Sequence, residues 1–269
     1  RLRNALGIAE YHGPRSQMMR EIANPTMLHD GSGMGALVGM MAVLLAEDGF
    51  DGAPAITVEA ADVAHHWADL GHRWTIELNY IKPYPVCRWA HAALDALTAL
   101  RREHGFGSDD VTRIDVRTFA QAAQLYPGMP DTTSQAQYSL PFALASLLVH
   151  GMLGPDQVQG AGLRDSTVAA QLDKITVTED ARHSARYPEG RWSDITVHLT
   201  SGATLTSGDV HARGGPEAPM AMQDVADKFH LMTRPLRHAR QSALWAMRDA
   251  VLQDDTRFAD LLALIHAPA

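Results

Sequence analysis

Two kinds of apolar spacing follow one another along this chain, and their order limits what it can fold into. Before about residue 80 and after about residue 214, apolar residues recur at the three- and four-residue spacing of amphipathic helices. Between those points, segments such as Val111–Thr118 and Ile195–Leu199 show the alternation of strands. This order favours a helical domain interrupted by an α+β domain over an alternating βαβ array with a parallel sheet.

We therefore predict a mainly α fold with an α+β insert. Residues 1–79 and 214–269 belong to one all-helical domain, and residues 80–213 form the smaller insert between them. The chain has no initiator Met and begins inside a helical pattern, so we expect an N-terminal part of the helical domain to precede it. The helical residues that are present should then expose apolar surface.

Turn and cap residues predict where the individual elements lie. The expected helices are Leu2–Tyr11, Met18–Ile22, Ser32–Ala46, His91–His104, Ser139–Val149, Met220–Met232, Pro235–Gln253 and Thr256–His266. The expected strands are Val111–Thr118, Ile175–Thr178, Ile195–Leu199 and Thr204–Thr206, the last two joined by a hairpin turn at Ser201-Gly202. Gly105 and Gly151 are placed to cap two of the helices.

The composition excludes several classes of function. The net charge of −8 lacks the electrostatic footprint of a nucleic-acid-binding protein. No apolar run reaches the roughly 18 residues that a membrane span requires. The single cysteine, Cys87, rules out an internal disulfide and a cysteine-based zinc cluster, and the cytoplasm is the expected compartment. We expect neither a nucleic-acid partner nor a membrane partner.

Residues 81–95 concentrate positive charge beside two prolines. The prolines restrict the backbone around Lys82, and Arg88 and His91 open an amphipathic helix. An acidic chain that binds an anionic ligand must gather its cations locally, and this segment does so. A solvated loop is the alternative interpretation, and the segment by itself does not decide between the two.

The Lys-x-Tyr-Pro motif in this segment, followed by a helix with Cys and His nearby, resembles a signature of the MmgE/PrpD family. Three further stretches match the family pattern in order, namely Leu28–Gly31, Gln135–Phe142 and Pro216–Pro219 with Lys228-Phe229 after it. The resemblance implies a helical domain with a lid-like domain and a homodimer. It also implies chemistry on small polycarboxylates, since the family includes 2-methylcitrate dehydratase, cis-aconitate decarboxylase and iminodisuccinate epimerase.

The resemblance also suggests roles for seven residues and places a catalytic Asp and one catalytic His before this chain begins. The candidate catalytic residues are Lys82 and His29. The candidate substrate-binding residues are Thr26, Ser32, Arg88, His91 and Phe142. If burial lowers the pKa of Lys82, its amine can transfer a proton, whereas in a wetter site it stays an ammonium that pairs with carboxylate. The sequence leaves both possibilities open.

Two of these positions depart from the family pattern. Thr26 stands where the family has a lysine, and a threonine carries no charge at neutral pH. Phe142 stands where some members place a tyrosine. His29 could instead cap a helix. The glycines around Ser32 allow close helix packing, and free backbone N–H groups at that helix start could also hold a substrate carboxylate.

These observations lead to a hydro-lyase as the expected activity, acting on a citrate-like polycarboxylate by α-proton removal and elimination. An epimerase or isomerase, a decarboxylase, and a family member without catalysis are the alternatives, and the Thr26 departure keeps them open. The histidines His65, His66 and His72 have no metal-ligand spacing as specific as His-Glu-x-x-His, so we expect no metal and no cofactor.

Overall fold

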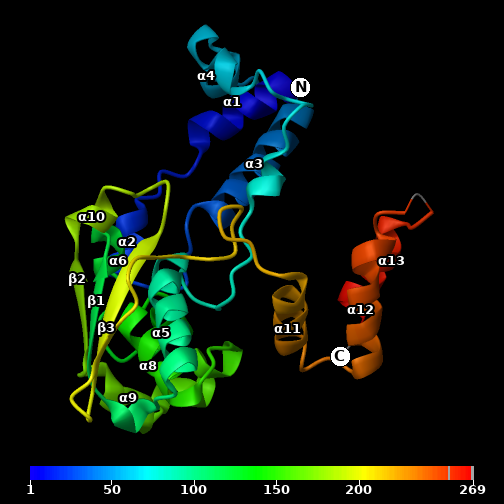
Figure 1. The fold of residues 1–269 in the computed structure, drawn as a ribbon. Helices are drawn as coiled ribbons and strands as arrows, with labels where there is room; N and C mark the ends of the chain where they lie inside the picture. The colour runs from blue at the N-terminus through cyan, green and yellow to red at the C-terminus, as the bar shows by residue number, and fades with distance from the viewer. Residues whose placement is uncertain (254, 268–269) are drawn as a thin grey trace. The chain divides into compact units, whose positions relative to one another are not determined.

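The computed structural model describes residues 1–253 and 255–267 (Figure 1). Helices predominate, and one small five-stranded sheet lies in the middle of the chain. This arrangement confirms the predicted fold class, a mainly α protein with an α+β insert. Among the described residues, none of the helices combines the length and apolar character that crossing a bilayer requires.

The described chain separates into two compact units. Unit 1 consists of residues 1–79 and 124–127, and unit 2 consists of residues 80–123 and 128–269. The predicted return of residues 214–269 to the helical domain stays a prediction.

Unit 1 is built around two helices that lie side by side, α1 (Leu2–His12) and α3 (Ser32–Glu47) (Figure 1). Their contact buries a small apolar core made of Ala5, Ile8, Ala42 and Ala46. A Cβ at Gly7 would overlap the backbone oxygen of Ala53, so only glycine permits this close approach. The glycines of α3 differ, because a Cβ at Gly33, Gly35 or Gly39 would meet nothing within 4 Å among the described residues, so the close packing predicted for them is not seen.

The rest of unit 1 is less regular than its sequence pattern predicts. It contains the short helices α2 (Met18–Ala23) and α4 (Ile56–Glu59) and two 3₁₀ turns at Ala61–His66 and Thr75–Leu78. Several large apolar side chains of α3 are exposed, and these are Met34, Leu37, Met40, Met41, Val43 and Leu44.

Unit 2 contains the sheet, whose strands are β1 (Val111–Thr118), β2 (Ile175–Glu179), β3 (Trp192–Leu199), β4 (Thr204–Thr206) and β5 (Val210–His211). The order is β2-β1-β3-β4, and β5 pairs with β3. The β1–β2 pair is parallel and all others are antiparallel. A mixed sheet of this kind agrees with an α+β insert and not with a βαβ array.

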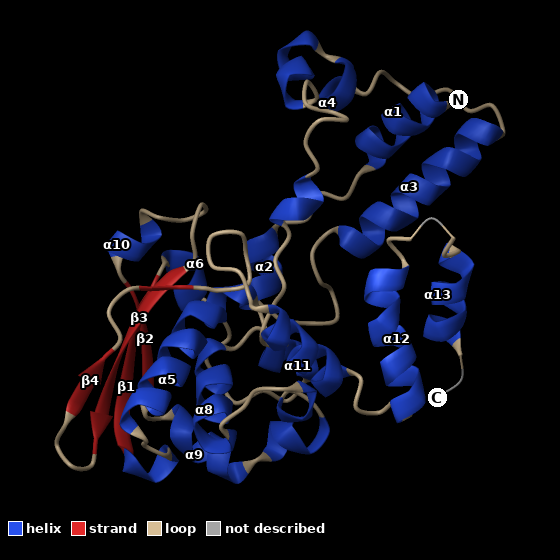
Figure 2. Cartoon of the chain, turned by 45° about the vertical axis from the view of Figure 1, so that its right-hand side comes forward, coloured by secondary structure: helices blue, strands red, loops and turns tan. Residues whose placement is uncertain are grey.

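The two faces of the sheet differ in polarity because side chains alternate along each strand. On the covered face, Ile114 pairs with Val197, and Val116 pairs with Ile195. All four side chains are fully buried. Helix α5 (His91–His104) packs against β3, and α8 (Leu140–His150) packs against α5 (Figure 2). The opposite face carries the charged side chains of β1 and β3.

The ends of α5 and α8 form as their sequences predict. Gly105 and Gly151 follow the two helices in the left-handed conformation, with φ of 67° and 74°. Ser139 precedes α8, and its side-chain oxygen accepts a hydrogen bond from the Phe142 N–H at 3.2 Å. These caps set the C-terminal ends of α5 and α8 and the start of α8.

The remaining helices of unit 2 are short or lie near the C-terminus. The short ones are α6 (Ala120–Ala123), α7 (Thr133–Gln137), α9 (Ser166–Leu172) and α10 (Ala181–Ser184). The C-terminal ones are α11 (Met222–Met232), α12 (His238–Ala250) and α13 (Phe258–His266). No described residue of α11, α12 or α13 is buried, and α12 and α13 lie side by side (Figure 2).

Candidate anion-binding site

Residues 80–87, which we call the strap, lead into α5 through a 3₁₀ turn at Arg88–Ala90. Two backbone hydrogen bonds hold the strap to distant parts of unit 2. The Ile81 N–H donates to the Gly214 carbonyl at 2.8 Å, and the Cys87 N–H donates to the Gln137 carbonyl at 2.7 Å. The strap, which contains the Lys-x-Tyr-Pro motif, is therefore hydrogen-bonded to the Gln135–Phe142 stretch and to Gly214, two residues before the Pro216–Pro219 stretch.

Lys82 and His91 share one backbone acceptor, the carbonyl oxygen of Val86. The Lys82 Nζ lies 3.4 Å from this oxygen, and the His91 Nε2 lies 3.2 Å from it. A carbonyl can only accept, so the His91 Nε2 carries the proton in this contact. The strap thus bends back so that its lysine approaches the start of α5.

His91 is fully buried, and its imidazole is not a third cation of the site. Burial lowers the pKa of His91 to about 3, and the nearby positive charge of Lys82 contributes in the same direction. Its Nδ1 has no hydrogen-bond partner among the described residues. At neutral pH this histidine is an uncharged donor to the strap.

Arg88 is almost completely buried and is held by two neighbours. Its Nη2 donates to the Ala212 carbonyl at 3.3 Å, and its guanidinium carbon lies 3.3 Å from the centre of the Tyr80 ring. Burial lowers the pKa of Arg88, but arginine stays charged at neutral pH. The Arg88 Nε has no partner among the described residues. A buried positive charge with a spare donor suits an anion.

Lys228 of α11 interacts electrostatically with Lys82, and Arg191 interacts with Arg88. Burial lowers the pKa of Lys228, and the charge of Lys82 lowers it further. Arg191 lowers the pKa of Arg88, whereas the carboxylate of Glu217 raises it. We call Lys82, Arg88, Arg191 and Lys228 the cation cluster. Four cations and the one carboxylate that acts on Arg88 leave an excess of positive charge within a chain of net charge −8.

Phe142 lies in the core of unit 2, where its side chain is fully buried at the start of α8. A phenyl ring there supplies apolar volume and no hydroxyl. The substrate-binding role predicted for Phe142 stays a prediction.

The candidate residues of unit 1 surround the turn between α2 and α3. The Thr26 hydroxyl accepts a hydrogen bond from the Leu28 N–H at 3.2 Å, and Ser32 is the first residue of α3. His29 is exposed in the turn between them. A groove of about 480 Å³ beside this turn is lined in part by Thr26, Arg15 and Arg20. The roles predicted for Thr26, His29 and Ser32 stay predictions.

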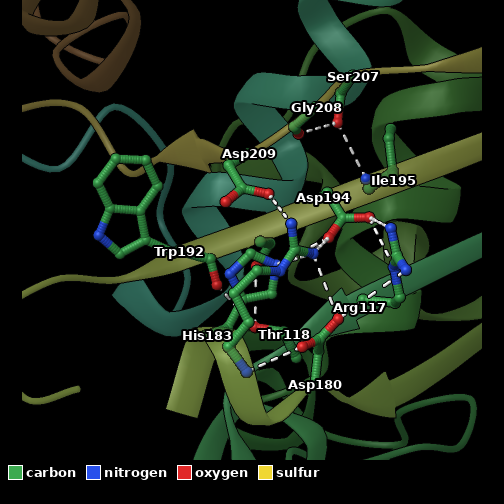
Figure 3. A network of polar contacts seen from close by, with 12 residues as sticks. Arg117, Thr118, Asp180, His183, Trp192, Asp194, Ile195, Ser207, Gly208 and Asp209 are labelled. Carbon is green, nitrogen blue, oxygen red and sulfur yellow. Dashed lines mark hydrogen bonds and ion pairs between the residues drawn. The ribbon is translucent and has the colours of Figure 1, made fainter. Parts of the chain in front are cut away.

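A second charged cluster lies at the polar face of the sheet, around the buried carboxylate of Asp194 (Figure 3). Arg117 binds one of its oxygens at 2.8 Å, and Arg182 binds the other at 2.7 Å. His183, which is fully buried, contacts the second oxygen through Nε2 at 2.8 Å. Arg182 and Arg186 also bind Asp209, at 2.6 and 2.7 Å.

We call this cluster the Asp194 network; its members are Arg117, Arg182, Arg186, Asp180, Asp194, Asp209 and His183. A hydrogen bond from the Arg182 N–H lowers the pKa of Asp180. Burial alone would raise the pKa of Asp209, but the hydrogen bond from Arg186 and the charge of Arg182 lower it. Three arginines thus face three aspartates, and the network holds α10 and the loop before β5 against the sheet.

Asp180, His183 and Asp194 place potential metal ligands within 4.8 Å of one another. The Arg182 Nη2 lies 3.2 Å from the Asp180 Oδ2, 2.7 Å from the Asp194 Oδ2 and 3.4 Å from the His183 Nε2. A cation of the chain itself therefore fills the position among the three ligand atoms, and its charge would repel a metal ion there.

Sequence reasoning placed Lys228 beside a family stretch without giving it a role in the site, and it missed Arg191 and the Asp194 network. The sequence holds three lysines, and two of them, Lys82 and Lys228, meet in one cluster. This low count is a signal that could have singled out Lys228. Asp180, Arg182 and His183 follow one another closely, but their pairing with Asp194 depends on the registers of β1 with β2 and with β3, which no local pattern specifies.

Residues 84–253, more than half of the chain, match the family model of the MmgE/PrpD C-terminal domain. The chain therefore belongs to the MmgE/PrpD family, whose members are generally lyases or related enzymes. The matched range includes Arg88, His91, Phe142 and Lys228, whereas Lys82 and His29 lie before it. No curated protein matches the chain by sequence.

Proposed function

We propose that this protein is a lyase, specifically a hydro-lyase that removes water from a small citrate-like polycarboxylate. The observation that carries the proposal is the excess of positive charge in the cation cluster. A substrate with two or three carboxylates would neutralise these cations, and each desolvated ion pair would add roughly 1.5–3 kcal/mol to binding. Membership of the MmgE/PrpD family supports the reaction class.

The reaction requires removal of a proton next to a carboxylate and departure of hydroxide. We assign substrate binding to Arg88, because a guanidinium pairs well with a carboxylate and its buried Nε–H has no partner among the described residues. Lys82 is the candidate proton-transfer residue, because it is the lysine of the Lys-x-Tyr-Pro motif and its Nζ lies at the start of α5, 3.4 Å from the Val86 carbonyl oxygen. His29 is the second candidate for proton handling, and its role is proposed from the family motif alone.

Variants of two lysines test the proposal in the purified full-length enzyme. Lys82→Ala should lower turnover of a citrate-like hydroxy acid about tenfold or more, through loss of a charged contact or a general base. Lys174→Ala is the matched control, because Lys174 donates to the Val111 carbonyl at 2.8 Å, away from the strap. Unchanged turnover and KM in Lys82→Ala would contradict the assignment.

Product analysis separates the hydro-lyase from the alternatives. Dehydration lowers the mass of the substrate by one water, decarboxylation releases carbon dioxide, and epimerisation changes neither mass nor composition. Thr26, which stands where the family has a lysine, keeps epimerisation as the second candidate. A screen of citrate-like hydroxy acids, their unsaturated counterparts and amino-dicarboxylate adducts would decide. Absence of turnover on all of them would favour a non-catalytic member of the family.

We also propose that the reaction needs no metal ion and that the protein is a cytoplasmic homodimer. Activity should survive exhaustive chelation, because the cluster supplies positive charge from side chains that no chelator removes. Loss of activity on chelation with recovery on adding zinc or iron would contradict the first point. Sedimentation would test the second.

A further inference from the structure

The strap packs against Gly214 and Gly215, which precede α11, so closely that neither position has room for a Cβ. Gly214 has a φ of 99°, which favours glycine, and its carbonyl accepts the hydrogen bond from the Ile81 N–H. Gly215 has no such backbone requirement, yet it is buried, and a Cβ on it would overlap the Tyr80 ring. The Tyr80 ring therefore rests directly on the Gly215 backbone.

Tyr80 has a second contact, with the guanidinium of Arg88. The guanidinium carbon lies 3.3 Å from the ring centre, within the range of cation–π stacking. The same guanidinium donates to the carbonyl of Ala212, which lies three residues before Gly215 in the chain. Residues 212–215 thus hold Arg88 directly through Ala212 and indirectly through Tyr80.

We propose that Gly215 and Tyr80 are positioning residues that set the orientation of the Arg88 guanidinium. A planar guanidinium binds a carboxylate well only in the right plane, so its orientation matters as much as its charge. Only a residue without Cβ lets the Tyr80 ring lie low enough to support Arg88. This inference rests on the proposed role of Arg88 in holding a substrate carboxylate.

The first readout is the Arg88 Nε–H resonance in the ¹⁵N-labelled full chain. Because of the ring current of Tyr80, this resonance should lie upfield of an ordinary arginine Nε–H. Gly215→Ala and Tyr80→Ala should each remove the upfield shift, and Tyr80→Phe, which keeps the ring, should retain it. Gly107→Ala is the matched control, because a Cβ there meets the nearest heavy atom at an ordinary 3.8 Å.

The second readout is citrate binding measured by calorimetry. Gly215→Ala and Tyr80→Ala should each weaken it about tenfold, with Gly107→Ala near the unmodified protein. Tyr80→Phe should weaken it less than Tyr80→Ala, because it keeps the ring and loses only the hydroxyl that also interacts with Arg88. A Cβ at Gly215 would overlap the Tyr80 ring and would lie 2.7 Å from the Glu217 Oε2. The double variant Gly215→Ala/Tyr80→Ala should therefore bind at most slightly more weakly than Tyr80→Ala alone, and that remainder comes from displacement of Glu217.

The outcomes distinguish a failure of the proposed function from a failure of the positioning role of Gly215 and Tyr80. If Arg88→Ala leaves citrate binding unchanged, the proposed function loses its carboxylate-binding residue. If Arg88→Ala weakens binding but Gly215→Ala and Tyr80→Ala alter neither the resonance nor the binding, the positioning role is overturned. Should Gly215→Ala fail to fold, Tyr80→Ala carries the same test, since the Tyr80 side chain is 40% exposed and its loss opens no deep cavity.

Discussion

The cation cluster and the Asp194 network both gather arginines in unit 2, but they differ in how their charge is neutralised. In the Asp194 network, three arginines meet three aspartates at distances of 2.6 to 3.2 Å. In the cation cluster, two lysines and two arginines lie together, and Glu217 is the carboxylate that acts on Arg88. A cluster that neutralises itself contributes to stability, whereas one with surplus charge is suited to bind a ligand of opposite charge.

The largest expected effect is on stability and comes from removing the shared carboxylate of the Asp194 network. Asp194→Asn would leave Arg117, Arg182 and His183 without their shared carboxylate, and we expect the free energy of unfolding to fall by about 3 kcal/mol. Arg117 and Arg182 are half exposed, which keeps the loss at the lower end for a buried ion pair. Urea denaturation monitored by circular dichroism measures it.

Asp115→Asn is the control for this variant. Asp115 pairs with Arg113 at 2.8 Å and with His198 at 3.0 Å on the same face of the sheet, but it is more exposed than Asp194. Its loss should cost no more than about 1 kcal/mol. Equal losses of unfolding free energy in Asp194→Asn and Asp115→Asn would show that the burial of Asp194 does not strengthen its ion pairs.

An intermediate effect should come from acidification, through His91 beside the cation cluster. The pKa of His91 falls from 6.5 to about 3 on folding, so between these values the unfolded chain binds a proton that the folded chain does not. Stability must therefore fall as the pH falls below 6.5. From pH 7 to pH 5, the contribution of His91 is a loss of about 2 kcal/mol.

His91→Gln isolates this contribution, because glutamine can keep an N–H donor to Val86 but does not titrate. Urea denaturation at pH 7 and at pH 5 should show that the unmodified protein loses about 2 kcal/mol more than the variant. The same pH dependence in both proteins would mean that His91 takes up its proton in the folded state.

The smallest expected effect is on ligand binding, from Lys228. Lys228→Met keeps the length of the side chain and removes one charge from the cation cluster, so citrate should bind about fivefold more weakly. Lys174→Met should bind citrate as the unmodified protein does. The difference should shrink at high salt, because partly exposed charges are screened. Tighter binding in Lys228→Met would contradict the idea of a surplus positive charge that attracts carboxylates.

The sequence alone determined the class of fold and most of the regular elements. Helix α5 and strand β1 have the predicted bounds, and Gly105 and Gly151 cap their helices as expected. These features depend on local interactions, namely apolar spacing, caps and turns, which a short segment carries by itself. The sequence also identified the strap and the family to which the chain belongs.

Only the tertiary structure decided which charges are compensated. Arg88 and Arg182 look alike in the sequence, yet Arg182 meets three aspartates, whereas Arg88 lies against a tyrosine ring and a backbone carbonyl. His91 looked like a third cation until its complete burial showed that it is neutral. Charge state and charge balance depend on desolvation and on partners as far as 124 positions away in the chain, and neither is written in a local pattern.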